Sequence, residues 1–74
     1  MTKQLRTSLN AANKQLNQGD VSEVSKLSGI SRPTCSSYLN GKGTNDDTAM
    51  KVLKAAKTVI RNRQKEIEAL TQEN

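Results

Sequence analysis

The sequence lacks histidine, tryptophan and phenylalanine, and it contains one cysteine and one aromatic residue among 74 residues. Histidine is the commonest general base and the commonest metal ligand, so its absence weakens the case for an enzyme or a zinc site. A lone cysteine, Cys35, forms no internal disulfide. Since no nucleophile–base pair or metal cluster stands out, we expect no catalytic activity, no metal and no cofactor.

Long hydrophobic runs are also missing. Only 32% of the residues are hydrophobic, and no run approaches the roughly 18 apolar residues that a membrane span requires. Met1 to Asn10 alternate polar and apolar residues, without the apolar segment of a signal peptide. We therefore expect a cytoplasmic protein with no membrane partner.

A chain of this length has room for one domain with one core. Such a domain buries only about 60% of the surface that its unfolded chain exposes, so its stability is marginal without a disulfide, a metal, a ligand or a partner. We therefore expect the chain to assemble with a partner.

Positive charge is in excess and unevenly distributed. The sequence contains twelve Lys and Arg residues and seven Asp and Glu residues, which gives a net charge of +5. Residues 51–65 contain no acid, whereas Glu66, Glu68 and Glu73 lie in the last nine residues. A basic surplus on a small domain points first to nucleic acid. One side of the predicted last helix forms a basic stripe, which is either a solvated face or a DNA contact: Lys51, Lys54, Lys57, Arg61 and Lys65.

Apolar residues recur at helical spacing in the first part of the chain. The steps of four, three and four residues place Leu5, Leu9, Ala12 and Leu16 on one helix face. The pattern predicts a first helix over residues 2–17, with Gly19 as the left-handed residue that ends it.

A second helix follows directly. The D-x-x-E pattern that begins at Asp20 is typical of a capping box and predicts a helix from Val21. Val24 and Leu27 form its buried stripe, and Gly29 interrupts the pattern after two turns.

The third predicted helix is short. Ser31 is a preferred N-cap, and residues 32–39 supply two turns. Pro33 is tolerated because the first N–H groups of a helix have no partner inside it. Cys35, Tyr38 and Leu39 are the core-facing members.

The remaining residues form one loop and one long helix. Residues 40–45 contain two glycines and two asparagines, which is typical of a loop. Asp46 or Asp47 then caps an amphipathic helix of about 25 residues, longer than a compact four-helix core covers. We predict an all-α fold, a compact helix-turn-helix bundle of about four helices with a long C-terminal helix.

Residues 21–40 carry the most specific pattern. The sequence V-S-E-V-S-K-L-S-G-I-S-R-P-T-C-S-S-Y-L-N places a small residue, Ser25, where two helices cross, and Gly29 where the turn needs a positive φ. It resembles the lambda-repressor/Cro-like helix-turn-helix family, and residues 28–40 also resemble the lactose-repressor-type headpiece. The departures are Ser25 in place of the usual alanine and Cys35 in place of the usual valine. We expect no ligand-binding domain after this pattern and therefore no small-molecule effector.

The resemblance implies that the third helix enters the major groove of double-stranded DNA. Its outward residues are Arg32, Pro33, Ser36, Ser37 and Asn40. We expect Arg32 to read guanine, with phosphate contact as the alternative, and the two serines to approach bases closely with weak discrimination. Pro33 packs on a thymine methyl or only starts the helix.

Other polar residues are expected on the DNA backbone. Ser31 and Thr34 lie near a helix N-terminus, where hydroxyl groups and backbone N–H groups bind anions, although Ser31 is alternatively only a cap. Ser22, Asn40, Lys42 and Thr44 are further candidates for phosphate contact, or ordinary solvated residues.

These features predict a sequence-specific transcriptional regulator, a small phage- or plasmid-type repressor that binds a palindromic operator as a homodimer. We expect residues 1–60 to form the DNA-binding domain and residues 61–74 a helical extension for dimerisation, through Ile60, Ile67 and Leu70. The alternative for the extension is a frayed tail on a monomer. Two recognition helices about 34 Å apart would match one turn of B-DNA.

A different function also fits the sequence. A helix-turn-helix antitoxin or adaptor would bind a partner protein through the same C-terminal helix. Cys35 is expected in the core as a small apolar residue, since a redox role needs an exposed, activated thiol and nothing nearby in the sequence supplies one.

Overall fold

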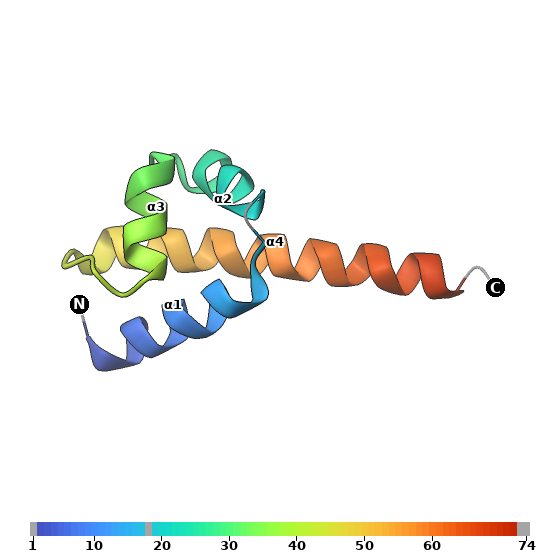
Figure 1. The fold of residues 1–74 in the computed structure, drawn as a ribbon, viewed down its shortest axis with the longest axis horizontal. Coiled ribbons are helices and arrows are strands. Elements are labelled where there is room, and N and C mark those ends of the chain that lie inside the picture. Colours follow the sequence, from blue (N-terminus) through green and yellow to red (C-terminus); the bar gives the residue numbers. More distant parts are fainter. Residues whose placement is uncertain (1, 18, 73–74) are drawn as a thin grey trace.

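Four helices make up the fold in the computed structural model, which describes residues 2–17 and 19–72. They are α1 (Lys3–Gln15), α2 (Asp20–Ser28), α3 (Arg32–Leu39) and α4 (Asp46–Gln72), as Figure 1 shows. No strand occurs in these residues. The predicted all-α bundle with a long C-terminal helix is therefore confirmed. Glu73, part of the predicted acidic end, lies outside the described residues.

The core lies where the three shorter helices meet the first half of α4. Its largest fully buried side chains are Leu9, Leu39, Val24, Val52 and Cys35. Tyr38 is also buried, so the predicted inward face of α3 is confirmed. The α4 side is made of small residues, which lets the other helices approach it closely: Ala49, Val52, Ala55, Ala56 and Val59.

The prediction that Leu27 is buried was wrong, because 54% of its surface is exposed. Helix α2 is only nine residues long and lays Val24 against the core. Leu27 is left at the edge of a shallow groove beside Lys54 and Ala55 of α4.

The connection between α1 and α2 also differs from its prediction. Helix α1 ends at Gln15, and Leu16 is extended with φ −95° and ψ 140°. Leu16 is half-buried and packs against the core, so the helix unwinds to turn this side chain inward. Gly19 has φ −68° and is not left-handed. It occupies the N-cap of α2, and the helix begins at Asp20 instead of Val21.

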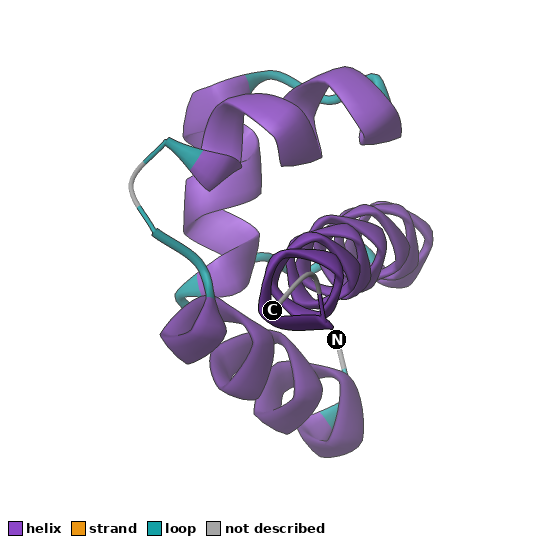
Figure 2. Ribbon diagram, turned by 90° about the vertical axis from the view of Figure 1, so that its right-hand side faces the viewer, coloured by secondary structure: helices purple, strands orange, loops and turns teal. Residues whose placement is uncertain are grey.

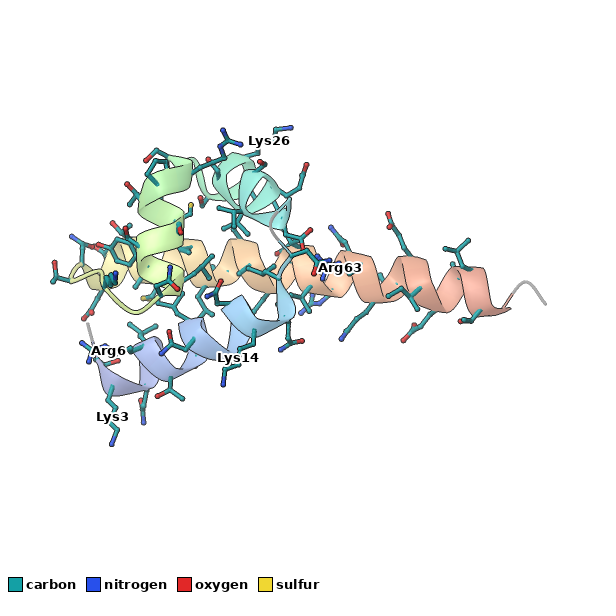
Figure 3. All side chains as sticks on the ribbon, in the orientation of Figure 1. Lys3, Arg6, Lys14, Lys26 and Arg63 are labelled. Carbon is teal, nitrogen blue, oxygen red and sulfur yellow. The ribbon has the colours of Figure 1, made fainter. Side chains whose placement is uncertain are left out.

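The predicted capping box is absent because Asp20 serves another purpose. Its carboxylate accepts a hydrogen bond from the backbone N–H of Asn17 (2.8 Å) and forms an ion pair with Arg63 of α4. Arg63 also donates to the carbonyl oxygen of Gln15 (2.8 Å). One arginine thus joins both ends of the α1–α2 connection to α4, and it lies at their junction in Figure 3.

Helix α4 begins one residue after the side chain that caps it. Asn45 Oδ1 accepts a hydrogen bond from the backbone N–H of Thr48 (3.0 Å). The prediction that Asp46 or Asp47 is the cap was therefore wrong. Both acids lie in the first turn, where their negative charge favours the positive end of the helix dipole.

The molecule is elongated because α4 extends beyond the bundle. Its extents are 46 × 22 × 18 Å, and the C-terminal part of α4 projects beyond the other helices (Figure 1). Figure 2, a view along α4, shows the three shorter helices around part of its circumference and one side uncovered. Among the described residues, no helix combines the length and the apolar character needed to cross a membrane.

Candidate nucleic-acid interface

The turn between α2 and α3 fixes how α3 is presented. Gly29 ends α2 with φ 73°, the left-handed conformation predicted for it. Two side chains donate to the carbonyl oxygen of Ile30, namely Ser25 Oγ (2.6 Å) and Cys35 Sγ (3.5 Å). The N–H of Ile30 donates to Ser28 Oγ (3.2 Å). Both backbone polar groups of Ile30 are therefore bound, which holds α3 at a defined angle to α2.

Hydroxyl groups gather at the N-terminus of α3. Ser31 occupies the N-cap position, as predicted, but its side chain makes no capping bond. Instead, Ser31 Oγ donates to Thr34 Oγ1 (2.9 Å), next to backbone N–H groups that have no partner inside the helix. The two predicted phosphate-binding residues therefore lie together.

Arg32 and Ser22 also meet, although they come from different helices. Arg32 Nη1 donates to Ser22 Oγ (3.0 Å), which links the first turn of α3 to the first turn of α2. Arg32 is exposed, and a guanidinium has five N–H donors. It can therefore hold Ser22 and bind a ligand at the same time.

The outward side of α3 is polar and free of carboxylates. Pro33, Ser36 and Ser37 are exposed. Asn40 is exposed as well, but its amide already donates to the carbonyl oxygen of Ser36 (2.9 Å) and accepts from Asn13 Nδ2 of α1 (3.3 Å). We call the following residues the α3 surface: Ser22, Ser31, Arg32, Pro33, Thr34, Ser36, Ser37 and Asn40.

The loop after α3 folds back against that helix. The N–H groups of Gly41 and Lys42 donate to the carbonyl oxygens of Tyr38 (3.0 Å) and Ser37 (2.9 Å). This is the Schellman pattern, which requires the left-handed φ of 78° that Gly41 has. It places Lys42 directly beyond the C-terminal end of the α3 surface. Thr44 is exposed in the same loop.

Helix α1 borders the same surface, which the sequence analysis missed. Asn13 bonds Asn40, and the aliphatic part of Arg6 lies against Gly41, with Cγ 3.0 Å from where a Cβ would stand. In Figure 3, Lys3 and Lys14 of the same helix point away from the bundle. Arg6 and Asn13 are seven residues apart, a spacing that places them on the same face of a helix. The sequence could have shown this shared face, but not which helix it contacts.

Charge near the α3 surface is positive. The two acids that precede α3 are each engaged with a cation, Asp20 with Arg63 and Glu23 with Lys26 (3.9 Å). Arg32, Lys42 and Arg6 are exposed around α3. An anion near this surface would therefore meet exposed cations.

The basic stripe of α4 lies elsewhere. Lys57 and Arg61 line a groove with α1, and Lys51 and Lys54 line another beside Leu27 of α2. None of the described residues that line these two grooves belongs to α3. Contact of this stripe with the DNA that α3 would bind stays a prediction.

The three predicted dimerisation residues differ in exposure. Ile60 is half-buried against the core, whereas Ile67 and Leu70 are 54% and 70% exposed. Packing against the core therefore explains part of the apolar character at Ile60, but it does not explain the apolar side chains of Ile67 and Leu70.

The described residues contain no cluster of three or more His, Cys, Asp or Glu side chains that could hold a metal ion. Comparisons with protein-family models, with curated proteins and with solved structures found no match to this chain.

Proposed function

We propose that the chain is a sequence-specific, cytoplasmic regulator that binds double-stranded DNA as a homodimer, with the α3 surface in the major groove. It would act as a small repressor on a palindromic operator, as the resemblance to the lambda-repressor/Cro-like family implies. The observation that carries the proposal is the start of α3, where the Ser31–Thr34 hydroxyl pair and the Arg32–Ser22 pair lie beside the first backbone N–H groups of the helix, which have no partner within it.

The arrangement supports separate roles along α3. Hydroxyl groups, N–H groups and a guanidinium at the helix start suit phosphate oxygens. Ser36 and Ser37, which are short and exposed one turn later, suit close approach to base edges. Arg32, the first residue of α3, reads guanine or neutralises a phosphate.

The first test is the salt dependence of binding to a labelled random-sequence duplex, measured by fluorescence anisotropy. Phosphate neutralisation predicts that the logarithm of affinity falls with the logarithm of salt concentration, with a slope of about −0.9 per phosphate contacted. A slope near zero would exclude DNA as the partner.

Selection of bound sites from a random DNA pool then supplies the specific sequence. On that site, Arg32→Ala should cost roughly 1–3 kcal/mol, and less on random duplex. Lys3→Ala is the matched control, because it removes one exposed cation from the far side of α1. Equal losses on both duplexes would make Arg32 a phosphate contact.

A second candidate is a helix-turn-helix antitoxin or adaptor that binds a different protein through α4. The observation in its favour is the exposure of Ile67 and Leu70. Stoichiometric purification of an unrelated protein with the full chain, together with no salt-sensitive DNA binding, would support this candidate over the first.

A further inference from the structure

An open groove of about 380 Å³ runs between α1 and α4. Its lining combines small or apolar residues, Ala11, Ala12 and Ile60, with the cations Lys57 and Arg61. None of the described residues that line it is acidic. An occupant of this groove should therefore be apolar on one side and negatively charged beside it.

The projecting end of α4 has those properties. Ile67 and Leu70 are exposed, and Glu66 and Glu68 are the nearest charged neighbours. At 100° per residue, Ile60, Gln64 and Ile67 lie on one strip about 60° wide. That strip runs from the groove onto the projecting end, with Gln64 between its two isoleucines.

Charge changes sign along the same side of the helix. Arg61 and Glu68 are seven residues apart, so they lie about 20° apart around the helix axis. Lys57 precedes Arg61 by one turn. A second α4 running in the opposite direction would therefore place its Glu68 near Lys57 and Arg61 of the first. The two-fold symmetry of such a pair would repeat this contact between Glu68 of the first copy and the two cations of the second.

We propose that two copies of the chain pair through α4 in antiparallel orientation, centred on Gln64. Each copy seats residues 67–71 in the α1–α4 groove of the other. Ile67 of one copy then packs on Ile60 of the other, and Glu68 lies between the cations of the groove. The inference rests on the proposed homodimer, but it does not depend on DNA binding.

The pairing has a consequence for DNA recognition. The core covers residues 49–59 of α4, so the middle of this stretch lies about ten residues from Gln64. Two such stretches would be roughly 30 Å apart along the paired helices at about 1.5 Å per residue. That separation is close to the one-turn spacing of half-sites on B-DNA, about 34 Å.

Charge reversal tests the pairing in the full chain. In the proposed dimer, position 61 of one copy lies near position 68 of the other. Arg61→Glu therefore gives a chain with acids at both positions, and Glu68→Arg gives a chain with cations at both. By sedimentation equilibrium, each variant alone should dimerise more weakly than the wild type by on the order of tenfold or more, because like charges then face each other. An equimolar mixture should regain wild-type affinity as a heterodimer.

Lys51→Glu is the matched control for charge. It also reverses an exposed cation on α4, but at a position ten residues before Arg61 and about 180° from Ile60 around the helix. Its dimerisation constant should stay within about threefold of the wild type. A loss equal to that of Arg61→Glu, or no recovery in the mixture, would overturn the proposal.

Cysteine crosslinking tests the orientation separately. Antiparallel pairing puts the two copies of residue 71 about 21 Å apart along the axis at about 1.5 Å per residue, too far for a disulfide. Thr71→Cys should therefore form no disulfide-linked dimer, and the native Cys35 is buried. Rapid crosslinking would demonstrate parallel pairing, which overturns this inference and leaves the proposed homodimer intact. A wild-type chain that is monomeric at 100 µM would refute both.

Discussion

At the scale of single residues, the two departures from the usual helix-turn-helix pattern act on the same atom. Ser25 and Cys35 both donate to the carbonyl oxygen of Ile30, at 2.6 and 3.5 Å. Alanine and valine, the usual residues, offer no such donor. The two departures therefore share one acceptor. The Ser25 hydroxyl group makes the shorter bond, and the buried Cys35 thiol adds a longer and weaker one.

Cys35→Val should leave folding and the proposed DNA binding nearly unchanged. The substitution exchanges one small buried side chain for another, at a cost below about 1.5 kcal/mol, and Ser25 still binds the Ile30 carbonyl. Urea denaturation of the two chains measures the difference. Loss of DNA binding in a variant as stable as the wild type would instead indicate a functional role for the thiol.

Gly43 is required for a close approach to an aromatic ring. A Cβ at this position would overlap the ring of Tyr38, which is buried and whose hydroxyl accepts a hydrogen bond from Asn45 N (3.1 Å). Gly43→Ala should therefore destabilise the fold by about 1–3 kcal/mol, or more if the loop cannot shift.

Gly19→Ala is the control for that substitution. No atom lies within 4 Å of a Cβ at Gly19, and its φ of −68° suits any residue. Its stability should change by less than about 1 kcal/mol. Equal unfolding midpoints for the two variants would show that the Tyr38 contact does not restrict the loop.

At the scale of the elements, the connection between α1 and α2 depends on a distant residue. Arg63 pairs with Asp20 and donates to the carbonyl oxygen of Gln15. Its side chain is 28% exposed and that of Asp20 is 19% exposed. Because both groups are largely withdrawn from water, removal of either one leaves the other poorly solvated.

Arg63→Met should lower the free energy of unfolding by about 1–3 kcal/mol, between the values for exposed and for buried ion pairs. Asp20→Asn should cost a similar amount. In the double variant, the costs should not add, because each single substitution already removes the pair. Additive losses in chemical denaturation would show that the two residues act independently.

At the scale of the whole molecule, α4 serves two regions. Its first half completes the core, whereas its C-terminal part projects from the bundle (Figure 1). The boundary between the regions is set by Arg63, which still belongs to the bundle through its contacts with Asp20 and Gln15. The predicted boundary after residue 60 would separate these contacts from the domain that they stabilise.

Two shortened chains distinguish these boundaries. A chain that ends after Lys65 keeps Arg63 and should retain the fold, with a melting temperature at low micromolar concentration within a few degrees of the wild type. A chain that ends after Arg61 should be clearly less stable.

Both shortened chains should be monomeric, because they lack Ile67 and Leu70. Sedimentation equilibrium measures this, and circular dichroism gives the melting temperatures. If the longer of the two is as dimeric as the full chain, the dimerisation surface is not at the end of α4.

The sequence by itself determined the elements of this protein. Four helices, the αL glycine at position 29 and the inward face of α3 follow from local spacing and residue type, because helix periodicity and turn chemistry act over a few neighbouring residues. The same local signals identified the residues of the α3 surface as candidates for DNA binding. They erred where a side chain is used by a distant element: Asp20 has the pattern of a cap, but Arg63, 43 positions later, takes its carboxylate.

Only the tertiary structure decided which residues meet. It brought Ser22 to Arg32 and Asn13 to Asn40, and it left Leu27 exposed, because such contacts depend on how helices pack and not on spacing within one helix. It also showed that the three predicted dimerisation residues differ in burial. Ile60 is half-buried against the core, whereas Ile67 and Leu70 are exposed beyond it. The hydrophobic pattern of α4 is continuous across both regions, whereas burial depends on where the shorter helices end.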